Sequence, residues 1–117
     1  MRSIVLLNRQ SGDENYHLLV QKIVLDKYLN DQPHTLVQLN GFQVEQFYTI
    51  PHALLYDLQK IKHEPLDCLL IYSVESIQRF VSIYPEKWLM ICTYFQDIKT
   101  ITGPQFHTET KALRHSL

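Results

Sequence analysis

The most constraining feature of this sequence is a short apolar run, Cys68 to Tyr72, that ends abruptly in polar residues. Pro65 and Ser73 bound the run, and it is apolar on both faces, which is typical of a strand buried inside a parallel sheet. We therefore predict that this run is a central strand. In such sheets ligands bind at the carboxyl ends of the strands, so chemistry is expected just beyond Tyr72.

A second apolar segment, Ile4 to Leu7, predicts another buried strand near the amino terminus. The polar residues 8–12 leave its carboxyl end. The carboxyl ends of parallel strands lie at one edge of a sheet. We therefore expect any active site between the segments that follow the carboxyl ends of these two strands. The polar side chains that follow the central strand are Ser73, Glu75, Ser76 and Arg79.

Helical patterns alternate with these strands. We predict helices over residues 15–29, from Pro51 to about residue 61, and over 75–83. Further strands are predicted over 35–39 and 88–92, whereas 93–102 should be irregular and 42–49 a loop with a short extended piece. Parallel neighbours need crossover connections, so the alternation predicts a three-layer α/β sandwich with a mostly parallel sheet of four to five strands.

The apolar positions also predict which face of each helix is buried. For the first helix the expected inward residues are Tyr16, Leu19, Val20, Ile23, Val24 and Tyr28. For the second helix they are Leu54, Leu55, Leu58 and Ile61, and for the third Ile77, Phe80, Val81 and Ile83. The aromatic residues of 42–49 and 93–95 fit either core packing or a binding surface.

Composition limits the classes of function. The chain has 117 residues, of which 45% are hydrophobic and 20% charged, as expected for one globular domain. Eleven Lys and Arg against twelve Asp and Glu give a net charge of −1, so any DNA contact would need a local patch or a partner. No apolar run approaches the roughly 20 residues of a membrane span, and we expect a cytoplasmic protein without membrane association. Cys68 and Cys92 are predicted to be core residues in strands, and the six histidines show no ligand spacing, so no metal site is expected.

Three segments together resemble one known family. Leu7-Asn8-Arg9-Gln10-Ser11 resembles the Tyr-x-Arg-Val-Ser motif that opens the catalytic domain of serine recombinases, the resolvase and invertase family. Asp67 to Arg79 resembles that family's Asp-x-Ile-x-Val-x-x-Leu-Asp-Arg-Leu-x-Arg segment. Ile91 to Gly103 is similar to its Ile-Asp-Thr-x-Thr segment and the following glycine, and Gln21 falls near a glutamine of its first long helix. The order and spacing hold over roughly residues 3–106.

The resemblance implies a resolvase-like fold and site-specific DNA recombination. In the family a serine hydroxyl attacks a DNA phosphodiester without a metal, and arginines hold the phosphate and stabilise the transition state. By resemblance Ser11 is the nucleophile, Arg9 and Arg79 contact the phosphate, and no cofactor is needed. From the residues alone, Ser11 also fits a helix-capping turn, and both arginines fit solvated surface positions.

This sequence departs from the family at two arginines. Ile50-Pro51 stands where the family has Arg-Pro, and Glu75-Ser76 stands where it has Asp-Arg. The family's preceding Ser-Gly is not recognisable in residues 42–49. Losing one preorganised charge donor typically lowers a rate by about 10²–10³. We therefore expect a degenerate or truncated member with impaired catalysis, acting as an interaction or regulatory module.

We expect a resolvase-like domain over 1–104 and a stub of a dimerisation helix over 105–117. Phe106 and Leu113 lie one heptad apart there, and they predict a homodimer. Two alternatives remain open: an active strand-transfer or nicking enzyme that uses Ser11, and a small ligand-binding regulatory domain unrelated to DNA. A closed pocket between the exits of the two buried strands would mark the last alternative.

Overall fold

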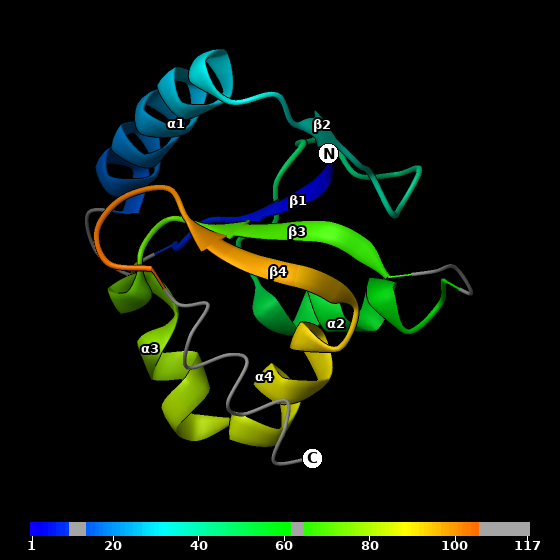
Figure 1. Ribbon diagram of the computed structural model, residues 1–117. Coiled ribbons are helices and arrows are strands. Elements are labelled where there is room, and N and C mark those ends of the chain that lie inside the picture. The colour runs from blue at the N-terminus through cyan, green and yellow to red at the C-terminus, as the bar shows by residue number, and fades with distance from the viewer. Residues whose placement is uncertain (10–13, 62–64, 106–117) are drawn as a thin grey trace.

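The computed structural model of the protein describes residues 1–9, 14–61 and 65–105 (Figure 1). Within these residues the chain order is β1 (Arg2–Leu6), α1 (Glu14–Asp31), β2 (Thr35–Leu36), α2 (Pro51–Leu58), β3 (Leu66–Ile71), α3 (Val74–Ile83), α4 (Pro85–Cys92) and β4 (Phe95–Thr100). The four strands are all parallel, in the order β2-β1-β3-β4. Helix α1 covers one face of the sheet, and α2, α3 and α4 cover the other. The predicted three-layer α/β sandwich is confirmed.

The two central strands, β1 and β3, supply most of the core, as their apolar composition predicts. Every side chain from Ile4 to Leu7 and from Cys68 to Ile71 is buried. Alternate side chains point to opposite faces of a strand, and the core is accordingly divided in two. Ile4, Leu6, Leu69 and Ile71 pack with α2, α3 and α4, whereas Val5, Leu7, Cys68 and Leu70 pack beneath α1.

The segment 88–92 is helical, and the strand predicted there is wrong. Pro85 occupies the first turn of α4, where its missing N–H is harmless. Trp88, Ile91 and Cys92 are spaced by three and four residues, so they share one helix face, and all three are fully buried. A short apolar run cannot be assigned to a strand or a helix by periodicity alone. Cys92 is thus a core residue, as expected, but in a helix.

The last strand, β4, lies in the segment 93–102 that was predicted to be irregular. Phe95 and Ile98 are buried on the side of α2, α3 and α4. Asp97 and Lys99 pair in register with Cys68 and Leu70, so they point to the face that α1 covers. Because β4 is an edge strand, this face of it can remain polar, and the polar residues obscured the strand pattern.

Half of the inner face predicted for helix α1 is wrong: of the six residues, Val20 and Val24 are partly buried and Tyr28 is partly buried against the core, but the other three are exposed. Tyr16, Leu19 and Ile23, expected to point inward, are 61%, 55% and 61% exposed. Leu25 is buried instead, and Leu18 and Leu29 are partly buried against the sheet. The helix has apolar residues on both sides, so periodicity alone could not identify its inner face.

The remaining differences are local. Strand β2 is shorter than the predicted 35–39, and Ile83 at the end of α3 is 55% exposed rather than inward, although Ile77 is buried as expected. The extended piece expected within 42–49 is Tyr48, which forms a parallel bridge to Leu6. Of the predicted stub 105–117, only Gln105 is described, so that stub and the boundary at 104 stay predictions.

Candidate functional site

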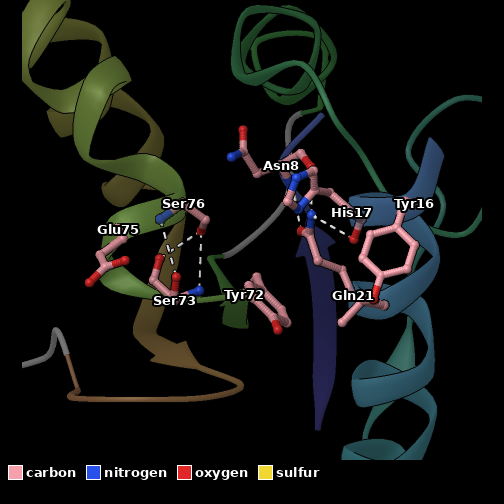
Figure 2. Close-up of a pocket in the computed structure, with 9 residues that line it drawn as sticks. Asn8, Tyr16, His17, Gln21, Tyr72, Ser73, Glu75 and Ser76 are labelled. Atoms are coloured by element: carbon pink, nitrogen blue, oxygen red, sulfur yellow. Dashed lines mark hydrogen bonds between the residues drawn. The ribbon is translucent and has the colours of Figure 1, made fainter. Parts of the chain in front are cut away.

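A pocket of about 300 Å³ opens at the carboxyl ends of β1 and β3 (Figure 2). From β1 the chain continues to β2 on one side, and from β3 it continues to β4 on the other. Diverging connections of this kind leave a crevice, which is where open parallel sheets usually bind ligands. We call this cavity the switch-point pocket. Its described lining consists of Asn8, Tyr16, His17, Val20, Gln21, Tyr72, Ser73, Glu75 and Ser76.

Gln21 fixes the exit of β1. Its side chain is only 5% exposed. The backbone N–H of Asn8 donates to Gln21 Oε1 at 2.8 Å, and Gln21 Nε2 donates to the Asn8 carbonyl at 2.6 Å. A longer bond of 3.3 Å joins Gln21 Nε2 to the carbonyl of His17. The buried amide is therefore satisfied, and Figure 2 shows the Asn8 carboxamide pointing away from it.

Ser73 and Ser76 form the opposite wall as a reciprocal cap of α3. The Ser76 N–H donates to Ser73 Oγ at 3.2 Å, and the Ser73 N–H donates to Ser76 Oγ at 3.1 Å. The Ser76 hydroxyl also donates to the Ser73 carbonyl at 2.6 Å. These bonds satisfy backbone groups at the helix start; the Ser76 hydroxyl both donates and accepts, and Ser73 Oγ accepts. Glu75 is exposed beside them, where a carboxylate is favoured by the helix dipole.

The charge of the switch-point pocket differs from that of a phosphate site. Among its described lining residues, Glu75 is the only Asp, Glu, Lys or Arg. The side chains of Gln21, Ser73 and Ser76 are hydrogen-bonded to backbone groups. The other polar groups of the lining are the hydroxyls of Tyr16 and Tyr72, the carboxamide of Asn8 and the exposed imidazole of His17. This set suits a neutral or cationic polar group better than an anion, because a carboxylate repels phosphate at close range.

The residues that the family resemblance selected stand apart from this lining. Arg9 is exposed and follows Asn8, and Arg79 is exposed on α3, one turn beyond Glu75; neither belongs to the described lining. Ser11 lies outside the described residues. Asp67, the first residue of the second matched segment, accepts a hydrogen bond of 2.6 Å from the backbone N–H of Arg2 at the other end of β3. Its observed contact is therefore between two strands.

Tyr16, His17 and Tyr72 line the pocket although the sequence pattern did not indicate them. Tyr16 was assigned to the core, and His17 and Tyr72 were not singled out. A positional signal could have found the first two, because a helix that follows a parallel strand starts at the carboxyl edge of the sheet. Its first turn must then lie beside the strand exit.

No three His, Cys, Asp or Glu side chains in the described ranges lie close enough together to hold a metal ion. Among the described helices, none has both the length and the apolar character needed to cross a membrane. Comparison with protein-family models, with curated proteins and with solved structures finds no match for this chain. The resemblance to serine recombinases therefore rests on sequence motifs alone and stays a prediction.

Proposed function

We propose that this protein is a serine-recombinase-like domain that does not cleave DNA and that acts as an interaction or regulatory module. The ordered motifs between Leu7 and Gly103 support the relation to the family. The observation that carries the loss of catalysis is the charge of the switch-point pocket, where Glu75 is the only Asp, Glu, Lys or Arg among the described lining residues. Phosphodiester cleavage needs cations around the developing charge.

The two missing arginines support the same conclusion. Ile50, at one of the family's arginine positions, is apolar and 56% exposed just before α2. Ser76, at the other, uses its hydroxyl to cap α3. Neither side chain can replace a guanidinium, and each loss typically lowers the rate by about 10²–10³.

Incubation with supercoiled DNA tests the proposal. We expect no covalent protein–DNA adduct on a denaturing gel and no nicked plasmid. An adduct that forms with the natural protein and with Ser82→Ala, a control at an exposed serine of α3, but not with Ser11→Ala, would establish the active strand-transfer alternative instead.

A small-ligand-binding domain is the second candidate, and the switch-point pocket itself favours it. The pocket offers a carboxylate, two tyrosine hydroxyls and a carboxamide, which suit a small molecule carrying an ammonium or several hydroxyl groups. Thermal-shift measurements with amino acids, polyamines and nucleotides would distinguish the candidates. Saturable stabilisation by an amine, lost in Glu75→Gln, would support ligand binding, because a ligand that binds only the folded state raises its stability.

The proposed partners follow from the family resemblance. We include in the proposal a cytoplasmic location, DNA contact through a local patch or a partner, and a homodimer formed through residues 105–117. If that segment is the interface, Leu113→Asp should lower the apparent mass in solution, because a charge would enter a self-complementary apolar contact.

A further inference from the structure

We propose that the open face of β4 binds a free α-amino acid, at a site separate from the switch-point pocket. The site is a groove of about 430 Å³ between β4 and the end of α1, and we call it the β4 groove. It shares no described lining residue with the switch-point pocket. Its described lining consists of Tyr28, Gln32, Asp97, Lys99, Thr100, Ile101 and Gln105.

The groove exists because one helix is too narrow to cover four strands. Neighbouring strands lie about 4.8 Å apart, and a helix with its side chains is about 10–12 Å wide, so one helix covers about two strands. The apolar contacts of α1 are with the two central strands, through Val5, Cys68 and Leu70. Among the described helices, α1 alone lies on this face of the sheet (Figure 1). The same face of β4 is therefore left open.

Two opposite charges lie next to each other on this open face. Asp97 and Lys99 pair in register with Cys68 and Leu70, so both point to the α1 side of the sheet, and both are half-buried. Within the described residues the Lys99 ammonium makes no hydrogen bond or ion pair. Asp97 uses only Oδ1, which accepts from the Ile98 N–H at 2.9 Å. The ammonium and the carboxylate Oδ2 are thus two charged groups that border one groove and are not paired with each other.

This pair of charges is complementary to a zwitterion. Residues two apart on a strand are separated by about 6.6 Å along the chain, which leaves room for a small group between their side chains. An α-amino acid carries an ammonium and a carboxylate on one carbon atom, so it can donate to Asp97 while it accepts from Lys99. Both contacts are charge-assisted hydrogen bonds, which are the stronger class. A peptide bond at either end of the ligand removes one of the two charges, so the pair selects a free amino acid.

The rest of the lining favours a ligand with an apolar side chain. Tyr28 and Ile101 are partly buried against the core beneath α1, and they offer apolar surface beside the two charges. Contact with this surface removes apolar area of the ligand from water. Leucine is therefore the probe that we choose.

Both sides of the β4 groove are held in place by contacts within the protein. Gln105 accepts from the Thr100 N–H at 3.1 Å and donates to the Thr100 carbonyl at 3.3 Å. The buried Thr100 hydroxyl donates to the Pro104 carbonyl at 2.9 Å. Across the groove the ring of Tyr28 packs on the ring of His34, with centroids 5.6 Å apart. A preformed site loses less conformational entropy when a ligand binds.

Thermal unfolding of the full chain with leucine tests the proposal. The charged contacts are only half-buried, so we expect a dissociation constant on the order of 1 mM. At about 20 mM leucine the midpoint of thermal unfolding should rise by roughly 3–8 °C. N-acetyl-leucine lacks the ammonium and leucinamide lacks the carboxylate. Each should bind at least about threefold more weakly than leucine, because each loses one charged contact.

The decisive variants are Lys99→Gln and Asp97→Asn, which each remove one charge at similar size. Each should raise the dissociation constant for leucine at least about threefold. Lys99→Gln should no longer distinguish leucine from leucinamide, and Asp97→Asn should no longer distinguish leucine from N-acetyl-leucine, because the discriminating contact is gone. The matched controls are Lys87→Gln and Glu86→Gln, at exposed positions of α4. Circular dichroism of all four variants will show that they are folded.

Backbone NMR locates the bound leucine. It should shift the amide resonances of residues 97–101 and leave those of residues 73–76, at the switch-point pocket, unchanged. The absence of saturable stabilisation, equal binding of leucine and its two derivatives, or unchanged binding in Lys99→Gln would overturn the proposal. Stabilisation that is lost in Glu75→Gln but kept in Lys99→Gln would assign the ligand to the switch-point pocket instead. None of these outcomes bears on DNA cleavage, which the adduct assay tests separately.

Discussion

The side-chain amide of Gln21 and the backbone of Asn8 close a pair of hydrogen bonds, at 2.8 and 2.6 Å, across the exit of β1. This pair ties the first helix to the first strand at the rim of the switch-point pocket. Because the Gln21 amide is buried, removing it would leave the N–H and carbonyl of Asn8 without these hydrogen-bond partners. Gln21 therefore acts on the pocket by positioning Asn8.

Replacing Gln21 tests this relationship. Gln21→Leu should lower the free energy of unfolding by about 1–3 kcal/mol, because it leaves the Asn8 N–H and carbonyl without their partner. Urea unfolding measures the change, and Gln78→Leu on the exposed side of α3 is the control. Equal stability of the natural protein and Gln21→Leu would contradict a structural role for the pair.

The acidic variant Gln21→Glu gives a sharper version of the same test. A carboxylate can accept from the Asn8 N–H but faces the Asn8 carbonyl without a proton to donate. Burial and that carbonyl should raise the pKa of the new carboxyl in the folded state, so the folded protein binds more protons than the unfolded one. The stability of Gln21→Glu relative to the natural protein should therefore increase from pH 7 to pH about 5. A pH-independent difference would indicate that the carboxyl is solvated.

The hydroxyl of Tyr48 donates to Asp57 Oδ2 at 2.7 Å inside the core, and Asp57 is 8% exposed. Burial, followed by this hydrogen bond to Asp57, raises the pKa of the Tyr48 hydroxyl well above its usual value. Tyr48→Phe should reduce the free energy of unfolding by about 1.5–3 kcal/mol, because it removes a hydrogen bond to a buried carboxyl group. Tyr56→Phe, at an exposed tyrosine of α2, should change it by less than about 0.5 kcal/mol. Similar losses in the two variants would exclude a specific role for the Tyr48–Asp57 bond.

His34 is expected to make the free energy of unfolding depend on pH. Partial burial, then the nearby Lys99 and the amino terminus, lower the pKa of His34 below its usual value, and its Nδ1 lies 2.7 Å from the Ser3 hydroxyl. The unfolded state therefore binds more protons than the folded state near pH 6. The contribution of neutral His34 to the free energy of unfolding is fully present above about pH 6.5, and it is lost as the pH falls toward the pKa of His34 in the folded state.

His34→Gln should flatten this part of the profile of unfolding free energy between pH 7 and pH about 5. His17→Gln, at an exposed histidine of α1, is the matched control. An identical slope in His34→Gln and the natural protein would show that other groups cause the pH dependence.

Burial raises the pKa of the Cys68 thiol to about 11. At pH 8 the thiol is then almost entirely protonated, and its side chain is inaccessible in the folded protein. Labelling of Cys68 by a thiol reagent in a Cys92→Ala protein should therefore require unfolding and should accelerate steeply with urea. Rapid stoichiometric labelling without denaturant would contradict the buried position.

The central part of the fold could be predicted from the sequence. The runs Ile4–Leu7 and Cys68–Tyr72 are apolar on both faces, as a strand covered by helices on both sides requires. Pro51 marked the start of α2 for a local reason, its missing N–H. Two neighbouring parallel strands predict a crevice at their carboxyl ends, and the switch-point pocket lies there. The roles of Arg9, Ser11 and Arg79 came from the family resemblance and stay predictions.

Only the tertiary structure revealed the inner face of α1 and the nature of the segments 88–92 and 93–102. Tyr16 and Leu25 lie on opposite apolar sides of one helix, so the periodic pattern is satisfied by either orientation. Trp88 to Cys92 is too short for its period to be measured, and Asp97 and Lys99 hide β4 because one face of this edge strand remains polar. In each case the local pattern fits two states, and only contacts between segments far apart in the sequence differ enough in energy to select one.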